Sequence, residues 1–572
     1  MSTIVGIDLG TTNSGVAVVS NGAPIMLPNG NERIIPSVVG YSSDGEWLVG
    51  TPARNQYVLN PDNTVRSIKR QMGSDFRVTL AGKSFSPQEI AAFTLRELKE
   101  IAERNLGHEV SEAVITVPAY FSDAARQATR DAGRIAGFEV RRIINEPTAA
   151  ALAYGLNMAE DQTVLVYDLG GGTFDVSLVE LMGGIVEVRA THGNTQLGGD
   201  DFDQLFAEKI AAWFEKKHKV NVRNDRRAWA RILRAAETAK IQLSSHPYAW
   251  IKEEYLAEKR GVPLHLEYEV SRKIFEALIQ PLLQKTLESI DQVILDSGVS
   301  ANQIDQVFMV GGSSYIPAVW ELVANALGRE PHMSVNPEEV VALGAGVQAA
   351  IIAGKPIDAI LVDVTPHSLG IAVAQVFMGK LISDRYSVLI HRNTTIPTTK
   401  EEEFYTVYPD QDTIRIEVYQ GEYPVASNNT ALGDFLVTGL EPETPGESAA
   451  VTVRFDFDVN GILNVTARDR KTGNQNAITV EATRARLSET EILAAAKWAE
   501  KTLPLPADLS AETIVLLDRA RKQLEDTAIT EDDRQELESL LMDIEAAQKQ
   551  GDSEDLEELT QTLLDLLFDL ED

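Results

Sequence analysis

Cysteine is absent from the 572-residue chain, and this excludes disulfide bonds and metal sites built on thiolates. The absence fits a reducing compartment. Basic residues are also few, because 52 Lys and Arg stand against 85 Asp and Glu and leave a net charge of −33. Such acidity argues against non-specific binding to nucleic acid or to an anionic membrane surface.

The chain also lacks an uncharged apolar run of the length that a membrane span requires. At Ile4 it enters an expected strand, with neither a basic segment nor a long apolar segment before it. We therefore expect a soluble, cytoplasmic protein that binds no membrane and no nucleic acid. The chain is too long for one core, so we expect about two to four domains.

Two common phosphate-binding motifs, G-x-x-x-x-G-K-[ST] and G-x-G-x-x-G, do not occur. A glycine-rich turn, DLGGGTFD, is present instead between two expected strands at 164–167 and 176–179. Its glycines would let backbone N–H groups approach an anion closely. Asp168 and Asp175 suit a hydrated cation lying between them and a phosphate. A glycine-rich hairpin of an antiparallel β-protein is the alternative interpretation.

A second copy of this pattern lies near the start of the chain. Residues 4–13, IVGIDLGTTN, read again as a strand that runs into an Asp, Gly and Thr turn, and 16–19 return as a strand. Two such hairpins indicate a duplicated domain that closes on one nucleotide from both sides.

The rest of the chain divides by pattern into four parts. Residues 1–355 mix strands and helices as an α/β domain does, and the short apolar segment 356–366 reads as a linker. Alternating strands predict an all-β domain over 367–485, where Asn460-Gly461 is the strongest hairpin signal. Helical spacing returns over 486–572, opened by a capping-box-like Ser488-Glu489-Thr490-Glu491.

Close packing and helix boundaries are also expected at particular positions. Ser122 should cap a helix over 124–137, and Pro147 should lie in the first turn of another. The alanines of that second helix, at 149–151 and 153, make it thin enough for another backbone to lie close to it. The acidic, leucine-spaced segment 551–572 predicts an amphipathic helix in a small bundle, with an acidic partner-binding tail as the alternative.

These motifs together resemble the DnaK-type seventy-kilodalton heat-shock chaperones over nearly the whole chain. The resemblance rests on GIDLGTTNS, VITVPAYFSDAARQATRDAG, RIINEPTAAALAYG, YDLGGGTFDVS, LGGDDFD, VGGSSYIP, DVTPHSLGI, RNTTIPT and YQGE. The segment after 69–73 is short, prolines break the start of the C-terminal helices, and no long tail follows. These three features are similar to the short, divergent bacterial branch called HscC.

The resemblance implies a multidomain protein with an actin-like (ribonuclease-H-like duplicated) ATPase domain, an all-β peptide-binding sandwich and an α-helical lid. Within the ATPase domain it assigns catalytic roles to four residues: Lys69, Glu146, Asp175 and Thr173. Asp8 and Asp168 would hold hydrated Mg²⁺ and neighbouring K⁺. Taken singly, Lys69 reads as a solvated surface charge and Glu146 as a carboxylate in the first turn of a helix.

The residues that the resemblance places against ATP or ADP fall into two groups. On the phosphate side they are Gly10, Thr11, Thr12, Asn13, Gly170, Gly171 and Gly172. On the adenosine side they are Glu237, Lys240, Ser244, Gly311, Gly312 and Ser313. The chain departs from the family pattern at Ile241 and Tyr315, where the family usually has Arg, and Tyr315 could stack on the base instead.

The resemblance also assigns a peptide-binding cleft and a set of coupling residues. The cleft and the arch over it map onto Ile371, Val373, Ala374, Phe404, Val407, Ile414 and Ile416. Ile414 and Ile416 also fit plain sandwich core. Coupling of a J-domain partner to hydrolysis maps onto Arg142, Asn145 and Asp363.

We therefore expect an ATP-dependent chaperone, an ATPase that binds extended or unfolded polypeptides and closes its cleft on hydrolysis. Its expected partners are a J-domain co-chaperone and a GrpE-type nucleotide exchange factor, and we expect a monomer. A dedicated-client regulatory chaperone with the same cycle is the nearest alternative. An actin-fold small-molecule kinase would need a small-molecule pocket and would have no use for the β-domain. An actin-like filament protein would lack that domain altogether.

Overall fold

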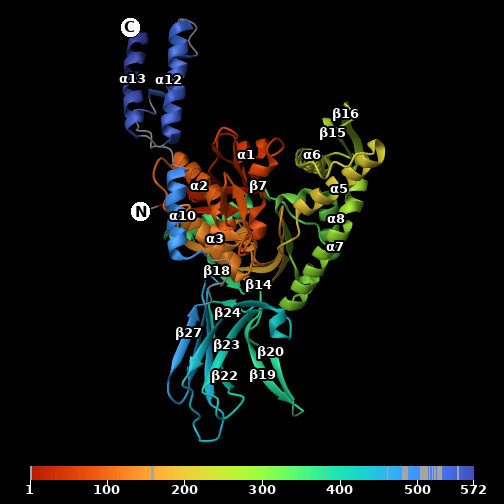
Figure 1. The fold of residues 1–572 in the computed structure, drawn as a ribbon, viewed down its shortest axis with the longest axis vertical. Helices are drawn as coiled ribbons and strands as arrows, with labels where there is room; N and C mark the ends of the chain where they lie inside the picture. The colour runs from red at the N-terminus through yellow and green to blue at the C-terminus, as the bar shows by residue number, and fades with distance from the viewer. Residues whose placement is uncertain are drawn as a thin grey trace.

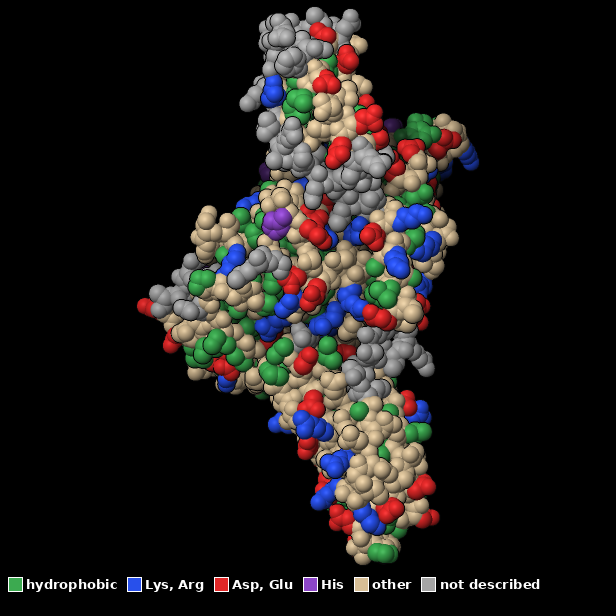
Figure 2. Space-filling model, turned by 90° about the vertical axis from the view of Figure 1, so that its left-hand side faces the viewer, with side chains coloured by type: hydrophobic (Ala, Val, Ile, Leu, Met, Phe, Trp, Pro, Cys, Tyr) green, Lys and Arg blue, Asp and Glu red, His purple; other side chains and the backbone are tan. Residues whose placement is uncertain are grey.

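A computed structural model gives the fold of the chain (Figure 1). The described residues are 3–155, 160–357, 359–378, 380–459, 461–479, 487–502, 531–550 and 553–571, with several more between 513 and 524. None of the described helices is both long enough and apolar enough to cross a membrane. Acidic and basic side chains are interspersed over the face shown in Figure 2, so the excess negative charge does not gather there into one patch.

Two α/β lobes take up the first 357 residues, and two short strands from further along the chain join the second lobe. Lobe I is built on a sheet of order β11-β10-β1-β2-β3, with β4 paired to β2. Its strands are β1 (Ile4–Leu9), β2 (Asn13–Ser20), β3 (Ala23–Met26), β4 (Ile35–Pro36), β10 (Glu112–Val117) and β11 (Glu139–Asn145). Its main helices are α2 (Pro87–Leu106) and α3 (Asp123–Ile135), and Ser122 caps α3 as predicted.

A smaller part of lobe I surrounds the loop that carries Lys69. It contains α1 (Thr51–Gln56) and two small sheets: β5 (Val38–Tyr41), β6 (Trp47–Val49) and β7 (Thr64–Arg66), then β8 (Val78–Leu80) and β9 (Lys83–Phe85). The buried side chains of these elements join the core of α2 and α3. The loop between β7 and β8 is therefore fixed to the body of the lobe.

Lobe II repeats the same arrangement around a sheet of order β17-β12-β13-β14-β18-β21. Its strands are β12 (Gln162–Leu169), β13 (Phe174–Met182), β14 (Ile185–Asn194), β17 (Gln306–Val310), β18 (Ile360–Val364) and β21 (Thr395–Ile396). Its helices are α5 (Gly199–His218), α6 (Arg226–Ser245), α7 (Arg272–Ser297) and α8 (Pro317–Leu327). A hairpin of β15 (Tyr248–Lys259) and β16 (Val262–Ser271) packs beside α6.

In each lobe an antiparallel hairpin, β1–β2 or β12–β13, carries one predicted phosphate turn at its tip. In each lobe a neighbouring strand, β10 or β17, continues the sheet in parallel. The duplicated sequence pattern thus corresponds to a repeated strand order, and the two turns occupy equivalent places.

Helices α4 (Glu146–Gly155) and α9 (Val340–Ile352) lie in contact between the two sheets. The predicted thinness of α4 is confirmed, because a side chain at Gly344 of α9 would strike the Ala149 carbonyl. A side chain at Gly6 of β1 would likewise strike the backbone at Gly346. Small residues therefore let α9 approach both α4 and β1, and they fix the lobes close together.

The expected linker, 356–366, is partly a strand. Its residues 360–364 form β18, which runs parallel to β14 and antiparallel to β21. The segment thus adds to the edge of the lobe II sheet, and the chain passes from there into the second half of the molecule.

The β-domain between 367 and 479 consists of two four-stranded antiparallel sheets. One has the order β20-β19-β23-β24, from β19 (Leu369–Phe377), β20 (Lys380–Ile390), β23 (Thr413–Gln420) and β24 (Thr430–Thr438). The other has the order β22-β25-β26-β27, from β22 (Thr398–Tyr405), β25 (Ala450–Phe457), β26 (Leu463–Asp469) and β27 (Gln475–Thr479). Their facing apolar side chains form one core.

The predicted hairpin between β25 and β26 is confirmed by the pairing of Phe457 with Leu463. Gly461 has a φ of 77°, as such a turn requires, whereas Asn460 lies outside the described residues.

The C-terminal helices are α10 (Glu489–Thr502), α12 (Glu531–Gln550) and α13 (Ser553–Glu571). The capping box before α10 is confirmed, since Ser488 and Glu491 exchange side-chain and backbone hydrogen bonds. Pro504 and Pro506 lie outside the described residues. Leucines of α13 pack with α12 as the predicted small bundle.

Figure 1 shows α10 lying along α2 and α3 of lobe I, with α12 and α13 beyond it and away from the β-domain. In this structure the helix that follows the β-domain is therefore packed on lobe I.

Candidate nucleotide site

Lys69 is a buried cation at the bottom of the cleft between the lobes. It lies in a short 3₁₀ turn, Ile68–Gln71, and its side chain is only 4% exposed. Its ammonium group forms an ion pair with Glu146, the first residue of α4. Because isolated buried charges are costly, each of these two groups depends on the other and on whatever else enters the cleft.

Three further carboxylates lie at the ends of the central strands. Burial, with the charge of Glu146 next, raises the pKa of Asp8 to about 7. The same two causes raise the pKa of Asp168 and of Asp175 well above the usual range. Asp8 accepts a hydrogen bond of 2.8 Å from Thr116, and Asp175 accepts one of 3.1 Å from a backbone N–H.

This cluster contains four acidic side chains and one lysine, so its ionised form is short of positive charge. Such a site favours a bound cation, because the cation would stabilise the carboxylates in their charged form. No group of three or more His, Cys, Asp or Glu converges as a direct metal-ligand set among the described residues. The donors therefore fit an ion held through water and phosphate oxygens better than one chelated by protein alone.

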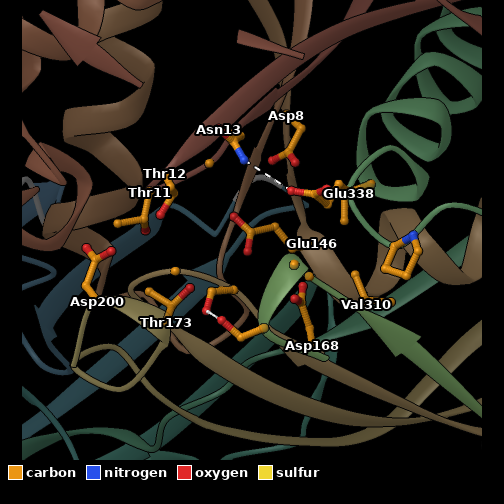
Figure 3. A pocket seen from close by; sticks show the side chains of 18 of the residues that line it. Asp8, Thr11, Thr12, Asn13, Glu146, Asp168, Thr173, Asp200, Val310 and Glu338 are labelled. Carbon is orange, nitrogen blue, oxygen red and sulfur yellow. Dashed lines mark hydrogen bonds between the residues drawn. The ribbon is translucent and has the colours of Figure 1, made fainter. Parts of the chain in front are cut away.

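The two phosphate turns face each other across the cleft (Figure 3). A side chain at Gly171 would strike the Thr12 hydroxyl, and one at Gly172 would strike Thr11. The Oγ1 atoms of Thr11 and Thr12 are buried and have no hydrogen-bond partner. Unpartnered buried hydroxyls are rare in folded proteins, so these two fit a ligand with oxygen acceptors.

Charged pairs lie on the side of the cleft predicted for adenosine, one across the cleft and one within lobe II. Arg66 of lobe I donates to Glu237 of α6 at 2.9 Å, and Lys240 donates to Asp203 at 2.7 Å. Burial, opposed by Lys240, raises the pKa of Asp203 to about 7. Ser244 donates to the Lys240 carbonyl at 3.3 Å rather than into the cleft.

The two departures from the family pattern lie in different places. Ile241 lines the cleft and is 63% exposed there. Tyr315 is absent from the residues that line it, and its hydroxyl donates to Asn336 at 3.2 Å. Stacking of Tyr315 on a base would therefore require its ring to leave Asn336.

Most of the residues expected to bind nucleotide line one cavity: Asp8, Gly10, Thr11, Thr12, Asn13, Lys69, Glu146, Asp168, Gly170, Gly171, Thr173, Glu237, Lys240, Gly311, Gly312 and Ser313. Gly172, Asp175 and Ser244 lie beside the cavity but do not line it.

Asp200 and Glu338 also line this cavity and were not expected to. Glu338 accepts a hydrogen bond of 3.1 Å from Asn13 across the cleft, and Asp200 accepts one from Ser67. Asp200 belongs to the LGGDDFD motif, which could have indicated it, whereas no local pattern marks Glu338.

A buried hydrogen-bond chain leads away from the cleft beside Glu146. Arg126 donates to Asn145 at 2.7 Å, and Asn145 donates to Asp363 of β18 at 2.8 Å. Thr148 donates to the same carboxylate at 3.3 Å. Burial raises the pKa of Asp363, while Arg126 and the more distant Arg142 favour its charged form. Two of the expected coupling residues, Arg142 and Asn145, thus act on the third, the buried carboxylate of Asp363.

Comparison with protein-family models shows which family the chain belongs to. The family model described as Hsp70 protein matches residues 4–79 and 74–570, nearly the whole chain. The chain belongs to the Hsp70 family. Hsp70 proteins are ATPases and ATP-dependent chaperones that bind polypeptide clients, and the cleft has the charges and unpartnered donors that ATP binding needs.

The expected peptide-binding residues of this Hsp70 lie on the β-domain but differ in exposure. Ile371 and Ile416 are buried in its core, while Val373, Phe404 and Ile414 are partly buried against that core. Ala374 and Val407 are exposed.

Proposed function

We propose that ATP opens a peptide-binding cleft in the β-domain of this chain and that hydrolysis closes it. The contact that carries this proposal is the buried hydrogen bond from Asn145 to Asp363. Asn145 is the neighbour of Glu146 in the nucleotide cleft, and Asp363 lies on the strand that leads into the β-domain. A change in the position of Glu146 would therefore reach β18 through one covalent neighbour and one hydrogen bond.

For the chemical step, we propose that Lys69 stabilises charge at the γ-phosphate and places the attacking water. Glu146 and Asp175 would orient that water, and Thr173 would lie against the γ-phosphate. Such a reaction depends on positioning and electrostatics more than on covalent chemistry by the protein. Mg²⁺ and K⁺ would supply positive charge to the phosphates, with Asp8 and Asp168 as their nearest carboxylates.

The phosphates would accept hydrogen bonds from residues 10–13 and 170–172. The adenosine would contact the residues that the resemblance places on the adenosine side of the cleft. The unpartnered hydroxyls of Thr11 and Thr12 support the phosphate assignment. At Ile241 an apolar side chain would meet the adenosine where the family usually has Arg. Affinity for nucleotide would therefore differ from the family norm.

The proposed domains are an actin-like (ribonuclease-H-like duplicated) ATPase domain over 1–355, a linker over 356–366, a β-sandwich over 367–485 and a helical lid over 486–572. The repeated strand order of the two lobes supports the first assignment. The peptide cleft, the J-domain partner, the GrpE-type exchange factor and membership of the HscC-type branch belong to the same proposal. A dedicated client is its narrower form.

Single-turnover hydrolysis tests the chemical part. In Lys69→Ala we expect hydrolysis to slow about a hundredfold or more, because one buried electrostatic group at the reacting phosphate is lost. ATP binding should persist, since many other groups contact the nucleotide. Lys285→Ala is the matched control, because Lys285 is an exposed lysine on α7. Hydrolysis at the control rate in Lys69→Ala would remove Lys69 from the mechanism.

A further inference from the structure

Lys69 lines two cavities rather than one. The first is the nucleotide cleft described above. The second, of about 710 Å³, lies on the other side of Lys69 and shares no other lining residue with the first. Lys69 is therefore the residue that separates the reaction centre from a second, larger space.

Three parts of the molecule form the wall of this rear cavity. Lobe I contributes residues from 69–72 and 120–125, and lobe II contributes residues from 192–196. The β-domain contributes 420–423 and 428–430, together with His367 and Arg392. The rear cavity thus connects the back of the reaction centre with the surface where the β-domain meets the lobes.

The charged groups on the wall are three cations, Lys69, Arg70 and Arg392, and one carboxylate, Glu422. Burial lowers the pKa of His192 and of His367, so both imidazoles are neutral at pH 7. Arg70 forms two hydrogen bonds of 3.1 Å with Asp201, yet its Nε is buried and has no hydrogen-bond partner. A side chain at Gly172 would come within 2.9 Å of the Arg70 Cδ, so Arg70 lies directly behind the phosphate turn. This lining suits a small anion.

The inner end of the rear cavity begins at the groups assigned to hydrolysis. The backbone N–H of Tyr120 donates to Asp175 at 3.1 Å. The Tyr120 ring lies 5.0 Å from the His192 ring and 4.2 Å from the His367 ring, between centroids. Lys69 therefore lines both cavities, and Asp175, which lines neither, is joined to the wall of the rear cavity through Tyr120.

We propose that the rear cavity is the path by which inorganic phosphate leaves after hydrolysis. This inference rests on the proposed function, because it takes the reacting phosphate to lie at Lys69. The phosphate is formed at the inner end of the nucleotide cleft, where bound ADP blocks the way out past Lys240 and Ile241. The basic lining on the far side of Lys69 offers the anion a second way out.

The experiment compares two rates in a single turnover without peptide. ADP formation is followed by rapid quench, and free phosphate is followed with a fluorescent phosphate sensor. Thr430→Trp places a large ring on the wall at the start of β24, and Thr438→Trp places the same ring at the far end of that strand. We expect the delay between ADP formation and phosphate release to be about fivefold longer in Thr430→Trp than in Thr438→Trp, because only the first substitution narrows the rear cavity.

A second pair of variants tests the charge and does not depend on a bulky substitution. Arg392→Gln and Asp296→Asn both remove the ion pair of 2.8 Å between Arg392 and Asp296, but only the first takes a cation from the rear cavity. We expect phosphate release to be about fivefold slower in Arg392→Gln than in Asp296→Asn, at equal rates of ADP formation.

The outcomes separate this inference from the proposed function. If ADP forms normally and phosphate release is equal within both pairs, the exit path is wrong and the proposed chemistry stands. If Lys69→Ala hydrolyses ATP at the rate of its control, the reacting phosphate is not at Lys69, and both proposals fail. A longer lag in Thr430→Trp and Arg392→Gln alone supports the path.

Discussion

The β-domain and helix α10 both pack against the nucleotide-binding lobes, but their contacts have opposite chemistry. The β-domain contact is polar: Arg392 and Asn393 donate to Asp296 at 2.8 and 3.0 Å, and the Thr191 N–H donates to Asn393 at 3.1 Å. The α10 contact is mainly apolar and aromatic, with an exposed ion pair between Arg134 and Glu489 at the start of the helix. Polar contacts near the surface respond to pH and salt, whereas apolar contacts depend on buried area.

Trp498 is the centre of the α10 contact. Its ring lies 5.7 Å from Trp47, 5.3 Å from Phe85 and 5.8 Å from Phe93, between centroids. The Lys83 ammonium lies 3.7 Å from the centroid of the same ring. Aromatic clusters of this kind add to the free energy of area burial, and a cation over the ring adds more.

The difference indicates which contact is built to be released. When the β-domain leaves the lobes, water replaces the protein partners in these hydrogen bonds, at a small cost in free energy. A small movement of β18 is therefore enough to change the docking equilibrium of the β-domain. The α10 interface must expose several aromatic rings at once. We therefore expect the β-domain contact to yield first in any change of conformation.

The largest expected effect comes from removing the aromatic centre of the α10 contact. Trp498→Ala should weaken docking of α10 by about 3 kcal/mol, because a large, partly buried ring and its aromatic neighbours lose contact. Hydrogen exchange measures this, and the amides of 492–499 should exchange about a hundredfold faster.

Leu493→Ala is the control for this change, since Leu493 lies on the same helix and is 53% exposed. Equal protection of α10 in both variants would contradict the assignment of Trp498 as the anchor.

The position of α10 also shows where prediction from sequence ends. Ser488 and Glu491 predict the start of the helix, because a capping box is a local pattern. The partner of its apolar face is set by Phe85 and Phe93, some 400 residues earlier, and no local pattern reports that.

The same limit holds in the nucleotide site. Asp8 and Asp168 could be found because each follows a buried strand and precedes a glycine turn. Arg66 and Glu338 could not, because their roles come from partners across the cleft, Glu237 and Asn13. The strand at 360–364 was expected as linker, since its apolar residues carry no sign of the sheet edge that pairs with them.

A smaller effect is expected from acid, and only on the β-domain contact. Burial is the main cause that lowers the pKa of His367 to about 4, with Tyr120 and Glu422 opposing it and Arg126 and His192 adding to it. The ordinary pKa of His is about 6.5, so the undocked state takes up a proton first as pH falls. Docking is therefore complete above about pH 6.5 and is lost progressively towards pH 4.

At about pH 5.5 the equilibrium constant for docking of the β-domain on the lobes should be lower than at neutral pH by about tenfold at most. Hydrogen exchange of the Thr191 amide, which donates to Asn393, measures this change in docking. The protection of the α10 amides against exchange should not change with pH. His367→Gln cannot take up this proton, so the pH slope should vanish in that variant. The same slope in His367→Gln would assign the titration to another group.

Salt should have the smallest effect and should again divide the two contacts. The side chains of Arg392 and Asp296 are 30% and 10% exposed, so their ion pair is partly screened by water and ions. Between about 0.05 and 0.5 M NaCl the Debye length falls several-fold, and a pair of this kind loses under about 1 kcal/mol. Exchange of the Thr191 amide should therefore rise about fivefold or less. Exchange of the α10 amides at 492–499 should change less, because the exposed Arg134–Glu489 ion pair lies at the start of the helix and apolar contacts hold the rest.

The variant Asp296→Asn gives this prediction its control, because it has no ion pair left to screen. Its Thr191 amide should exchange faster than wild type at low salt and should change little as salt rises, so that the two proteins converge at high salt. If the Thr191 amide of wild type still exchanges more slowly than that of Asp296→Asn at high salt, the hydrogen bond from Asn393 to Asp296 rather than the ion pair holds the β-domain. If the α10 amides follow the Thr191 amide instead, the two contacts form one cooperative unit, and the contrast between a polar and an apolar interface has no separate consequence for release.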